Sequence, residues 1–391
     1  MNDTPRPSQS DSPRVLIYSQ RNLLSILPFR CAHFEFENII TQIDSADIIA
    51  PRIDPSNLRH IVAKRIAYHS SLALNPGIQR IPIERDYELF LAICGDPTDL
   101  LRLSALGDWR SRCRKSVCLI DELWVTQMDS YHSFLRLLES FDVVMLYYNQ
   151  SVGPLGKRIG SQCAYLPPGV DTIRFCPYPT WPKRVIDVYS VGRRSKITHG
   201  TLLKMVQEKG LFYLHDSLTA NQVIDPMEHR ALFANLAKRS RYFIVNPGLI
   251  DRRDIRGDQI EIGDRYFEAA ASGAIMLGER PDNPEFANLF GWPDSMIHLP
   301  FDSPDIDKIV KALDKDPEGQ GRMQRRNAKE ALMRHDWAYR WEEILGAVGL
   351  EPMPELFQRK ERLRQLAEDI THGEITSGQD VSDVISKQRS F

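Results

Sequence analysis

The chain has 391 residues, of which 42% are hydrophobic, and its formal net charge at pH 7 is −2. This length predicts two domains of ordinary size, and the hydrophobic content is too high for a disordered chain. Because the net charge is close to zero, no global field attracts nucleic acid or an anionic membrane. We therefore expect no nucleic-acid partner, and any phosphate binding must come from local basic clusters.

The six cysteines are scattered, with no Cys-x-x-Cys pair and no Cys/His cluster at zinc spacing. They are Cys31, Cys94, Cys113, Cys118, Cys163 and Cys176. This pattern indicates reduced, mostly buried thiols, which is typical of a cytosolic protein. No apolar run reaches the length of a membrane span, and the N-terminus lacks the core of a signal peptide. We therefore expect a cytoplasmic protein without a membrane span.

The first half of the chain alternates short apolar runs with stretches of helix length. Residues 1–13 are rich in Pro, Ser and Asp and are predicted to be disordered. The apolar runs lie at residues 14–19, 46–50, 89–93, 117–120 and 143–147. Such alternation predicts a parallel sheet that helices cover on both faces. Pro177, Pro179 and Pro182 then stiffen a short connector, and we place a domain boundary between residues 171 and 183.

The alternation restarts after this connector. Strands are predicted at residues 185–191, 211–214 and 242–245, and helices at 201–209, 226–240 and 322–348. In the last of these helices, Trp341, Ile344, Leu345 and Val348 form a packing stripe. Leu356, Leu363, Leu366 and Ile370 predict one more amphipathic helix. We expect that helix to cross back onto the first domain, although a homodimer contact is nearly as well supported, and the rest of the chain to form a polar tail.

One stretch, residues 262–279, combines several signals. Asp264 is a good helix N-cap, and Gly273 can take the left-handed conformation that ends a helix. Arg265 and Glu268 then share one helix face, and residues 274–277 form a short buried strand. A helix start with a cationic side chain suits a phosphate, and a carboxylate one turn later can bind vicinal hydroxyls, as on a ribose. The alternative is a surface ion pair on an ordinary helix.

The sequence of residues 265–273, Arg-Tyr-Phe-Glu-Ala-Ala-Ala-Ser-Gly, resembles the "R-x-FE-x-xA-x-G" signature of GT-B glycosyltransferases, especially the CgeB-like branch. The resemblance implies that Glu268 holds the nucleotide ribose and that Arg265 contacts a phosphate or the sugar. Many retaining members of the family carry a second Glu eight positions earlier, where this chain has Ile260, with Glu261 one step away. That donor-sugar contact is therefore not carried over.

Two further segments carry the same resemblance. Residues 163–171, followed by Phe175, resemble the "lPxGvD-x-x-x-F" segment that leads out of the first GT-B domain. Residues 335–345 resemble the "H-x-x-x-x-R-x-x-x-IL" ending of the CgeB-like transferases. After the first strand, however, residues 20–22 are Gln-Arg-Asn in place of the Gly-rich loop that several family members place there, so this donor contact is not implied.

A basic segment, residues 192–200, follows a predicted strand and contains Arg193, Arg194, Lys196 and His199. Ligands of open α/β sheets bind at the carboxyl ends of the strands, where cations suit a diphosphate. The segment resembles the "vGR…KG" segment that grips the donor phosphates in the family. Arg193 stands in the place of its Arg, and His199 stands where Lys is usual, which would make phosphate binding depend on pH. The alternative is a solvated basic turn.

Asp121 and Glu122 follow the predicted strand at residues 117–120. They resemble the "HD" or "DE" loop that faces the transferred sugar in GT-B enzymes. We expect only one of the two to point into a cleft, where a carboxylate can stabilise positive charge on the sugar ring or relay a proton. The alternative is an exposed acidic turn or helix cap. Asp96 and His33 are weaker candidates of the same kind.

Taken with the resemblance, these observations predict an α/β chain with two doubly wound Rossmann-like domains that face a cleft. The predicted segments are residues 14–175 (acceptor domain), 183–348 (donor domain) and 349–391 (C-terminal helix and tail). We expect a glycosyltransferase of glycan biosynthesis that moves a sugar from a nucleotide-diphosphate sugar to a glycan, lipid-linked or protein acceptor, without a bound metal. The alternatives are a nucleotide-sugar epimerase on the same fold, or a non-catalytic partner subunit, which Ile260 and His199 motivate.

Overall fold

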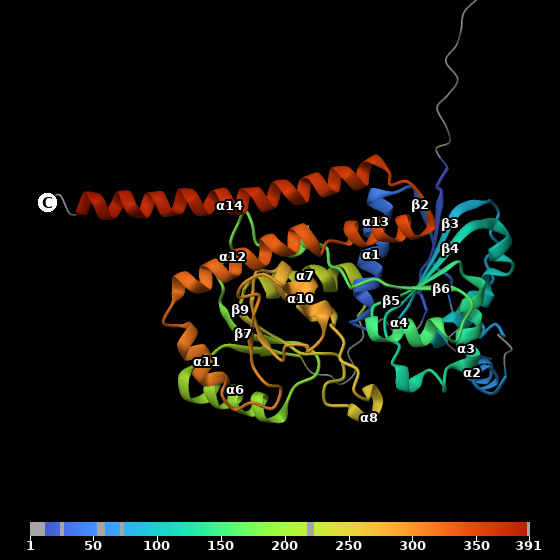
Figure 1. The fold of residues 1–391 in the computed structure, drawn as a ribbon, viewed down its shortest axis with the longest axis horizontal. Helices are drawn as coiled ribbons and strands as arrows, with labels where there is room; N and C mark the ends of the chain where they lie inside the picture. Colours follow the sequence, from blue (N-terminus) through green and yellow to red (C-terminus); the bar gives the residue numbers. More distant parts are fainter. Residues whose placement is uncertain (1–11, 24–26, 53–58, 71–73, 217–222, 389–391) are drawn as a thin grey trace, which may run out of the picture.

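The computed structural model describes residues 12–23, 27–52, 59–70, 74–216 and 223–388, and it contains two separate parallel sheets (Figure 1). The predicted disordered segment, residues 1–13, lies outside the described residues except for its last two. The first sheet has six strands in the order β2-β1-β3-β4-β5-β6. These strands are β1 (Val15–Tyr18), β2 (Ala46–Ile49), β3 (Tyr87–Cys94), β4 (Cys113–Ile120), β5 (Val143–Leu146) and β6 (Gln162–Tyr165).

The second sheet has five strands in the order β11-β10-β9-β7-β8, and every strand pair in both sheets is parallel. Its strands are β7 (Ile186–Ser190), β8 (Tyr213–His215), β9 (Ser240–Val245), β10 (Ile275–Gly278) and β11 (Met296–His298). The α/β prediction with two sheets is therefore confirmed. The predictions did not include β6 and β11, which are only four and three residues long and have only partly buried or exposed side chains.

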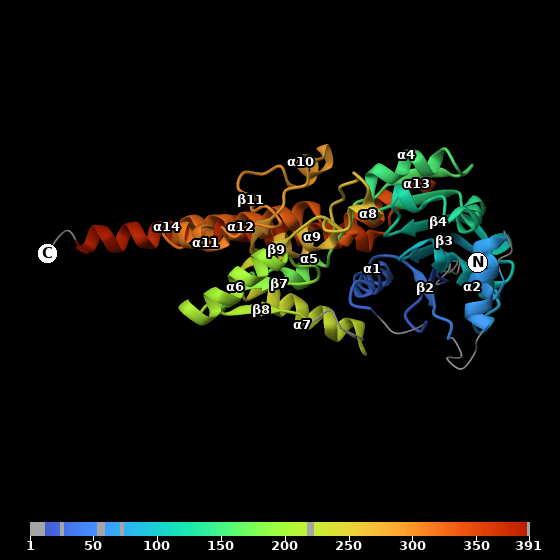
Figure 2. The ribbon, with the colours of Figure 1, turned by 90° about the horizontal axis from the view of Figure 1, so that it is seen from below.

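Helices cover both faces of each sheet (Figure 2). In β1, Val15 and Ile17 point into one core and Leu16 and Tyr18 into the other, which is the alternation of a strand buried on both faces. The helices of the first half are α1 (Arg30–Ile43), α2 (Arg59–His69), α3 (His132–Leu135) and α4 (Asn149–Gly156), with 3₁₀ segments at Pro97–Leu106, Trp109–Arg112, Val125–Gln127 and Arg136–Ser140.

The connection from β6 to β7 contains α5 (Thr172–Phe175), and the boundary that we predict between residues 171 and 183 lies within it. The division into residues 14–175 and 183–348 remains a prediction. The helices that follow are α6 (Lys196–Lys209), α7 (Pro226–Lys238), α8 (Arg253–Arg256), α9 (Asp264–Ala271), α10 (Pro284–Phe290), α11 (Ile306–Leu313), α12 (Pro317–Arg334), α13 (Trp337–Val348) and α14 (Pro354–Gln388).

The prediction of one helix over residues 322–348 is wrong, because the chain breaks between α12 and α13. The Asp336 backbone is extended, and its carboxylate accepts a hydrogen bond from the Ala338 amide, so that it caps a new helix. The Val170 amide donates to the His335 carbonyl at 3.0 Å, which fixes the break against the connection between the sheets. The break redirects α13 toward the first sheet.

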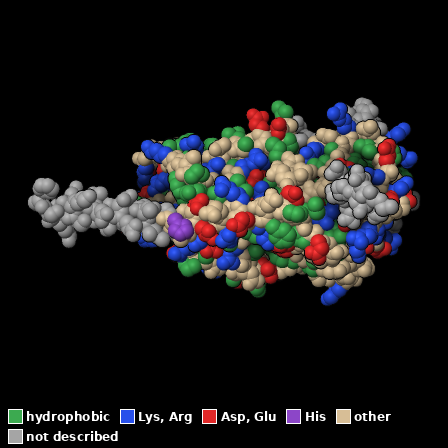
Figure 3. Space-filling view, turned by 90° about the horizontal axis from the view of Figure 1, so that it is seen from above, with side chains coloured by type: hydrophobic (Ala, Val, Ile, Leu, Met, Phe, Trp, Pro, Cys, Tyr) green, Lys and Arg blue, Asp and Glu red, His purple; other side chains and the backbone are tan. Residues whose placement is uncertain are grey.

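The C-terminal helices span both sheets (Figure 1). Trp341, Ile344 and Leu345 of α13 pack in the core of the first sheet, so the predicted packing stripe is confirmed. Leu356 of α14 joins the same core, whereas Leu363 and its neighbours pack against α12. The helix predicted to cross back onto the first domain therefore does so only at its start. Acidic and basic side chains are interspersed on the face seen in Figure 3, as the small net charge suggests.

Gly169 allows the connection between the sheets to lie against the Trp337 ring, since a Cβ at this position would be 2.5 Å from Trp337 Cε3. We expect Gly169→Ala to lower the free energy of unfolding by about 1–3 kcal/mol through overpacking. The matched control is Gly346→Ala in α13, where an added Cβ meets no atom within 4 Å. That variant should gain about 0.5–1 kcal/mol, because Ala suits a helix interior better than Gly. Urea unfolding midpoints test both, and equal midpoints would contradict the packing argument.

Candidate active site

A cleft of about 360 Å³ opens where the carboxyl ends of both sheets meet. From the first half of the chain it is lined by Phe29, Asp121, Glu122, Tyr148 and Pro168. From the second half it is lined by residues 191–193, 244, 246–249 and 262–265. These second-half residues lie at the carboxyl ends of β7 and β9 or around the start of α9, which is where open parallel sheets bind ligands. The volume suits a small ligand.

The cleft brings together five of the nine predicted site residues: Asp121, Glu122, Arg193, Asp264 and Arg265. The other four lie elsewhere. Arg194 and His199 line a separate small cavity, Lys196 is exposed, and Glu268 is buried behind Arg265. Carboxylates from the first sheet therefore face cations from the second sheet across one space.

Asp121 and Glu122 both line the cleft, contrary to the expectation that only one would, but their partners differ. Asp121 Oδ2 lies 3.0 Å from Nε2 of His33, a buried residue of α1. Glu122 Oε1 accepts a 2.7 Å hydrogen bond from the indole N–H of Trp124. Burial raises the pKa of Glu122, and the bond from Trp124 partly offsets this rise. Asp121 is thus held by the imidazole of His33, and Glu122 by the indole of Trp124.

Asp96, a weaker candidate, does not belong to the cleft lining. Its carboxylate accepts from the Thr98 amide at 2.7 Å and caps the 3₁₀ segment at residues 97–106. This is the ordinary role of an Asp before a helical turn. His33, the other weaker candidate, contacts the cleft through Asp121.

The prediction that Asp264 caps α9 is wrong. Gly263 is the N-cap residue, with no side-chain cap, and Asp264 is the first helical residue, so that its side chain lines the cleft. Burial raises the pKa of Asp264 to about 7, and the negative charges of Asp121 and Glu268 add to the rise. The predicted C-terminus is confirmed: Gly273 has φ of 65°, and the amide of Ala274 donates back to the Ala269 carbonyl, as in a Schellman motif.

Glu268 lies beneath the cleft with both carboxylate oxygens engaged. Arg265 donates to Oε2 and Arg230 of α7 donates to Oε1, and Glu268 is only 1% exposed. Arg265 thus lies between Glu268 and the cleft. Glu261, the neighbour of the family's second Glu position, does not line the cleft either. It accepts from the backbone amides of Asn149 and Gln150 at the start of α4.

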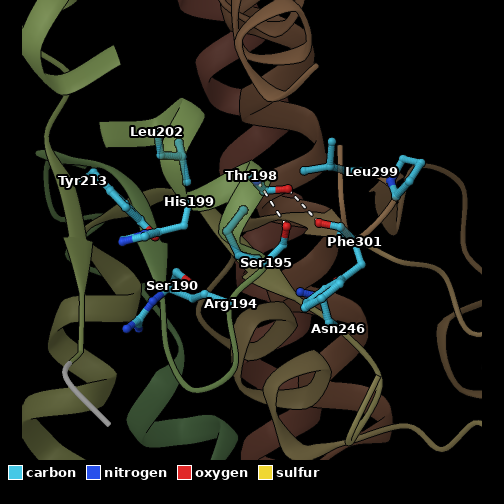
Figure 4. A pocket seen from close by; sticks show the side chains of 13 residues that line it. Ser190, Arg194, Ser195, Thr198, His199, Leu202, Tyr213, Asn246, Leu299 and Phe301 are labelled. Atoms are coloured by element: carbon cyan, nitrogen blue, oxygen red, sulfur yellow. Dashed lines mark hydrogen bonds between the residues drawn. The ribbon is translucent and has the colours of Figure 1, made fainter. Parts of the chain in front are cut away.

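The second cavity is much smaller, with about 20 Å³, which is the space of about one water molecule. Figure 4 shows Arg194 and His199 beside it, together with Tyr213. His199 Nδ1 lies 2.9 Å from the Tyr213 hydroxyl, and Arg194 pairs with Asp216. Burial lowers the pKa of His199, and the nearby charges of Arg194 and His215 lower it further. These contacts disfavour His199 as a phosphate-binding cation.

The basic segment also starts its helix earlier than predicted. The Ser195 hydroxyl accepts from the amides of Ile197 and Thr198, which makes Ser195 the N-cap of α6. Lys196 and His199 are therefore helical, whereas Arg193 stays in the loop before the helix. Arg193 pairs with Asp251 at 3.3 Å, and its side chain is 42% exposed. Of the four basic residues, only Arg193 lines the cleft.

Phe29, Tyr148 and residues 246–249 of the cleft lining were not predicted from the sequence, and neither was Arg230. The Asn-Pro-Gly segment at residues 246–248 follows a predicted strand, and this could have indicated a cleft loop. Nothing in the pattern of the helix at residues 226–238 distinguishes Arg230 from its other polar residues. Among the described residues, we find no group of three or more His, Cys, Asp or Glu placed to hold a metal ion. Nor does any helix in that part of the chain combine the length and the apolar character of a membrane span.

Comparisons with known proteins agree with this architecture. Residues 187–346 match the family model described as glycosyl transferase-like. The structure of Anabaena Alr3699/HepE in complex with UDP and glucose is similar, with a TM-score of 0.50 and 11% identity over 86% of this chain and 99% of that one. An alpha-glucosyltransferase in complex with UDP and a 13-mer DNA containing a HMU base has a TM-score of 0.50 and 9% identity, over 86% of this chain and all of the other. No curated protein matches the sequence significantly.

At these identities the structural likeness shows the fold alone. The family model describes only the second half of the chain, residues 187–346. The six-stranded and five-stranded parallel sheets are those of GT-B structures. Residues 187–346 therefore resemble the glycosyl transferase-like family, within a chain that has the GT-B fold.

Proposed function

We propose that the protein is a glycosyltransferase that moves a sugar from a nucleoside diphosphate sugar to an acceptor hydroxyl. One observation carries this proposal: carboxylates from the first half and arginines from the second half line the same cleft, and these arginines lie within the stretch that matches the glycosyl transferase-like family model. Both similar structures contain UDP, and one also contains glucose. UDP and UDP-glucose are therefore the first probes.

The donor diphosphate would bind at the start of α9. The helix has no side-chain cap, so its first amides can donate to an anion, and the helix dipole favours negative charge there. Arg265 and Arg193 line the same region of the cleft and can form charge-assisted hydrogen bonds to phosphate oxygens. When the bond between the anomeric carbon and the phosphate oxygen breaks, these groups would stabilise the charge of the leaving diphosphate without a metal. In this proposal Glu268 holds Arg265, because arginines engage both of its carboxylate oxygens, and the ribose contact that the resemblance implies for Glu268 is not part of the proposal.

Asp121 is the group that we assign to the acceptor. The acceptor oxygen forms a bond to the anomeric carbon, the bond to the diphosphate breaks, and the proton of the acceptor hydroxyl passes to the Asp121 carboxylate. The carboxylate also lies near the positive charge that develops on the sugar ring. His33 holds Asp121 at Oδ2 and so fixes its orientation. Since His33 is buried and does not line the cleft, we assign it a positioning role.

Donor affinity should depend on pH through Asp264. The groups that act on its carboxyl are Asp121, Glu268, Arg265 and His33, and its pKa is raised to about 7. Below pH 7 it is mostly neutral, and above pH 7 its negative charge repels the diphosphate. If the ionised Asp264 lowers the affinity tenfold, which corresponds to roughly 1.4 kcal/mol of repulsion, we expect UDP-glucose to bind about fivefold more weakly at pH 8 than at pH 6.

In Asp264→Asn the affinity for UDP-glucose should stay high and nearly constant between pH 6 and pH 8. A sugar diester is the better probe, because a terminal phosphate itself ionises near pH 6 and would add its own pH dependence. Calorimetric titration at the two pH values makes the comparison. An equal pH dependence in the wild type and in Asp264→Asn would show that another group is responsible.

A thermal-shift screen of nucleoside diphosphates and their sugars tests the proposed function, since a ligand that binds the folded state raises the apparent stability. We expect stabilisation by a nucleoside diphosphate sugar, followed by sugar transfer to an added acceptor. Interconversion of the donor sugar without an acceptor would instead identify an epimerase. Binding without turnover would identify a non-catalytic subunit, and no stabilisation by any nucleotide would contradict the proposal.

A further inference from the structure

Arg230 of α7 joins the two halves of the molecule through two buried carboxylates. Its guanidinium donates to Glu35 of α1 and to Glu268 of α9, and all three residues are 1% exposed. The guanidinium also lies over the ring of Phe175, 4.8 Å from its centroid. A buried charge is costly unless it is paired, and here each charge has a partner of opposite sign.

These contacts continue in both directions. Glu35 Oε1 accepts from the amide of Asp171 at 2.6 Å, and Glu268 Oε2 accepts from Arg265. Every carboxylate oxygen of Glu35 and Glu268 is therefore engaged. Of Glu35, Arg230, Glu268 and Arg265, only Arg265 lines the cleft. The series runs from the connection between the sheets to a side chain that faces the donor site.

We infer that Arg230 is a positioning residue that holds Glu268 so that the Arg265 guanidinium is directed into the cleft, and that it ties this arrangement to the first sheet through Glu35. The inference rests on the proposed function, because it gives Arg265 the donor diphosphate as its ligand. Arg suits the role, since its planar fork can donate to two carboxylates at once, whereas Lys is a compact point charge. A long Arg265 side chain without a fixed acceptor would lose this preorganisation.

Helix α1 extends the connection to the opposite wall of the cleft. Glu35 and His33 are two residues apart on this helix, so their side chains point to different sides. Glu35 reaches Arg230 on the second half, and His33 reaches Asp121 on the first. Arg230 thus fixes α9 to the helix that orients the proposed catalytic carboxylate.

A double-mutant cycle tests the inference. Nucleoside diphosphate affinity is measured by calorimetry for the wild type, Arg230→Lys, Arg265→Ala and the double variant, with UDP as the probe. We expect Arg230→Lys to weaken binding about tenfold, within the range of couplings measured between contacting residues. If Arg230 acts through Arg265, then Arg230→Lys should cause no further loss in the Arg265→Ala background. If Arg230 had a merely structural role, folded Arg230→Lys would bind UDP with the wild-type affinity.

The matched control is Arg241→Lys. Arg241 also bridges two carboxylates, Asp187 and Asp314, but it lies near the start of β9, at the end of the second sheet away from the cleft. Its replacement should leave UDP affinity at the wild-type value. If Arg230→Lys does not fold, Glu35→Gln removes the charge at the other end of the pair and should weaken UDP binding only while Arg265 is present.

Wild-type affinity in Arg230→Lys, or independent and additive losses in the double variant, would overturn the inference and leave the proposed function intact. If Arg230→Lys does not fold and Glu35→Gln is used in its place, wild-type affinity in Glu35→Gln would also overturn the inference. If the wild type binds neither UDP nor any other nucleoside diphosphate, the proposed function fails first, and the inference fails with it.

Discussion

Replacing Asp121 by Asn should lower kcat by about 10²–10⁴-fold, the usual contribution of a positioned acid–base group. Donor affinity should change little, because the carboxylate acts mainly when charge and a proton move in the transition state. Asn keeps the shape of the side chain and can still contact His33, so the fold should persist. Steady-state kinetics together with donor titration separate the two effects.

Glu122→Gln is the matched control for Asp121→Asn. Glu122 lines the same cleft, but its carboxylate is bound to the indole of the buried Trp124. Gln retains an oxygen that can accept this bond, so we expect turnover close to the wild-type value. If the two effects were reversed, Glu122 would be the catalytic carboxylate. Wild-type rates in both variants would make the loop structural, and Asp264 would become the next candidate.

Arg193→Ala and Arg265→Ala should each weaken nucleoside diphosphate sugar binding by about ten- to a hundredfold, because a hydrogen bond to a charged group contributes roughly 1.5–3 kcal/mol. Both side chains line the cleft. Calorimetric titration of each variant gives the affinity. If a variant lost as much affinity for the nucleoside alone as for the nucleoside diphosphate sugar, the assignment of these arginines to the diphosphate would be contradicted.

The controls for this pair are Arg194→Ala and Lys196→Ala, from the same basic segment. Arg194 pairs with Asp216 beside the small cavity, and Lys196 is exposed. Both variants should bind the donor as the wild type does, since neither residue lines the cleft. If they lost affinity as strongly as Arg193→Ala, the whole basic segment would have to contact the donor, which would require it to change its position when the donor binds. Glu268→Ala is unsuitable for this series, because it would leave the buried Arg230 with one partner fewer and destabilise the fold.

Much of the architecture could be predicted, because strands that are buried on both faces appear as continuous apolar runs. The core strands β3, β4, β5, β7 and β9 all coincide with such runs. The strands β6 and β11 were not found this way, because each is only three or four residues long and its side chains are only partly buried or exposed. The break at Asp336 was missed because the helical pattern continues on both sides of it. Asp336 caps α13 and could have indicated the break, which its pairing with the connection at Val170 then fixes.

The sequence predicted which residues follow the strands and so lie near the site. It did not predict which of their side chains face the cleft. Asp121 and Arg193 follow strands, so their meeting at the sheet edges could be expected. Whether a side chain faces the cleft depends on its partners across the fold. Glu268 is buried because Arg230, from a helix 38 residues earlier, takes one of its oxygens, and Arg194 is turned toward Asp216. These contacts are long-range, and no local pattern marks them.

A crystal structure with a bound nucleoside diphosphate sugar tests the account most directly. We predict that the diphosphate lies within hydrogen-bonding distance of Arg193, Arg265 and the first amides of α9, and that the sugar lies beside Asp121. A nucleotide bound elsewhere would contradict the account, as would a sugar pointing away from the first sheet. The surface cavity of the first half around residues 80–83 and 105–112, which also contains arginines, is one such place.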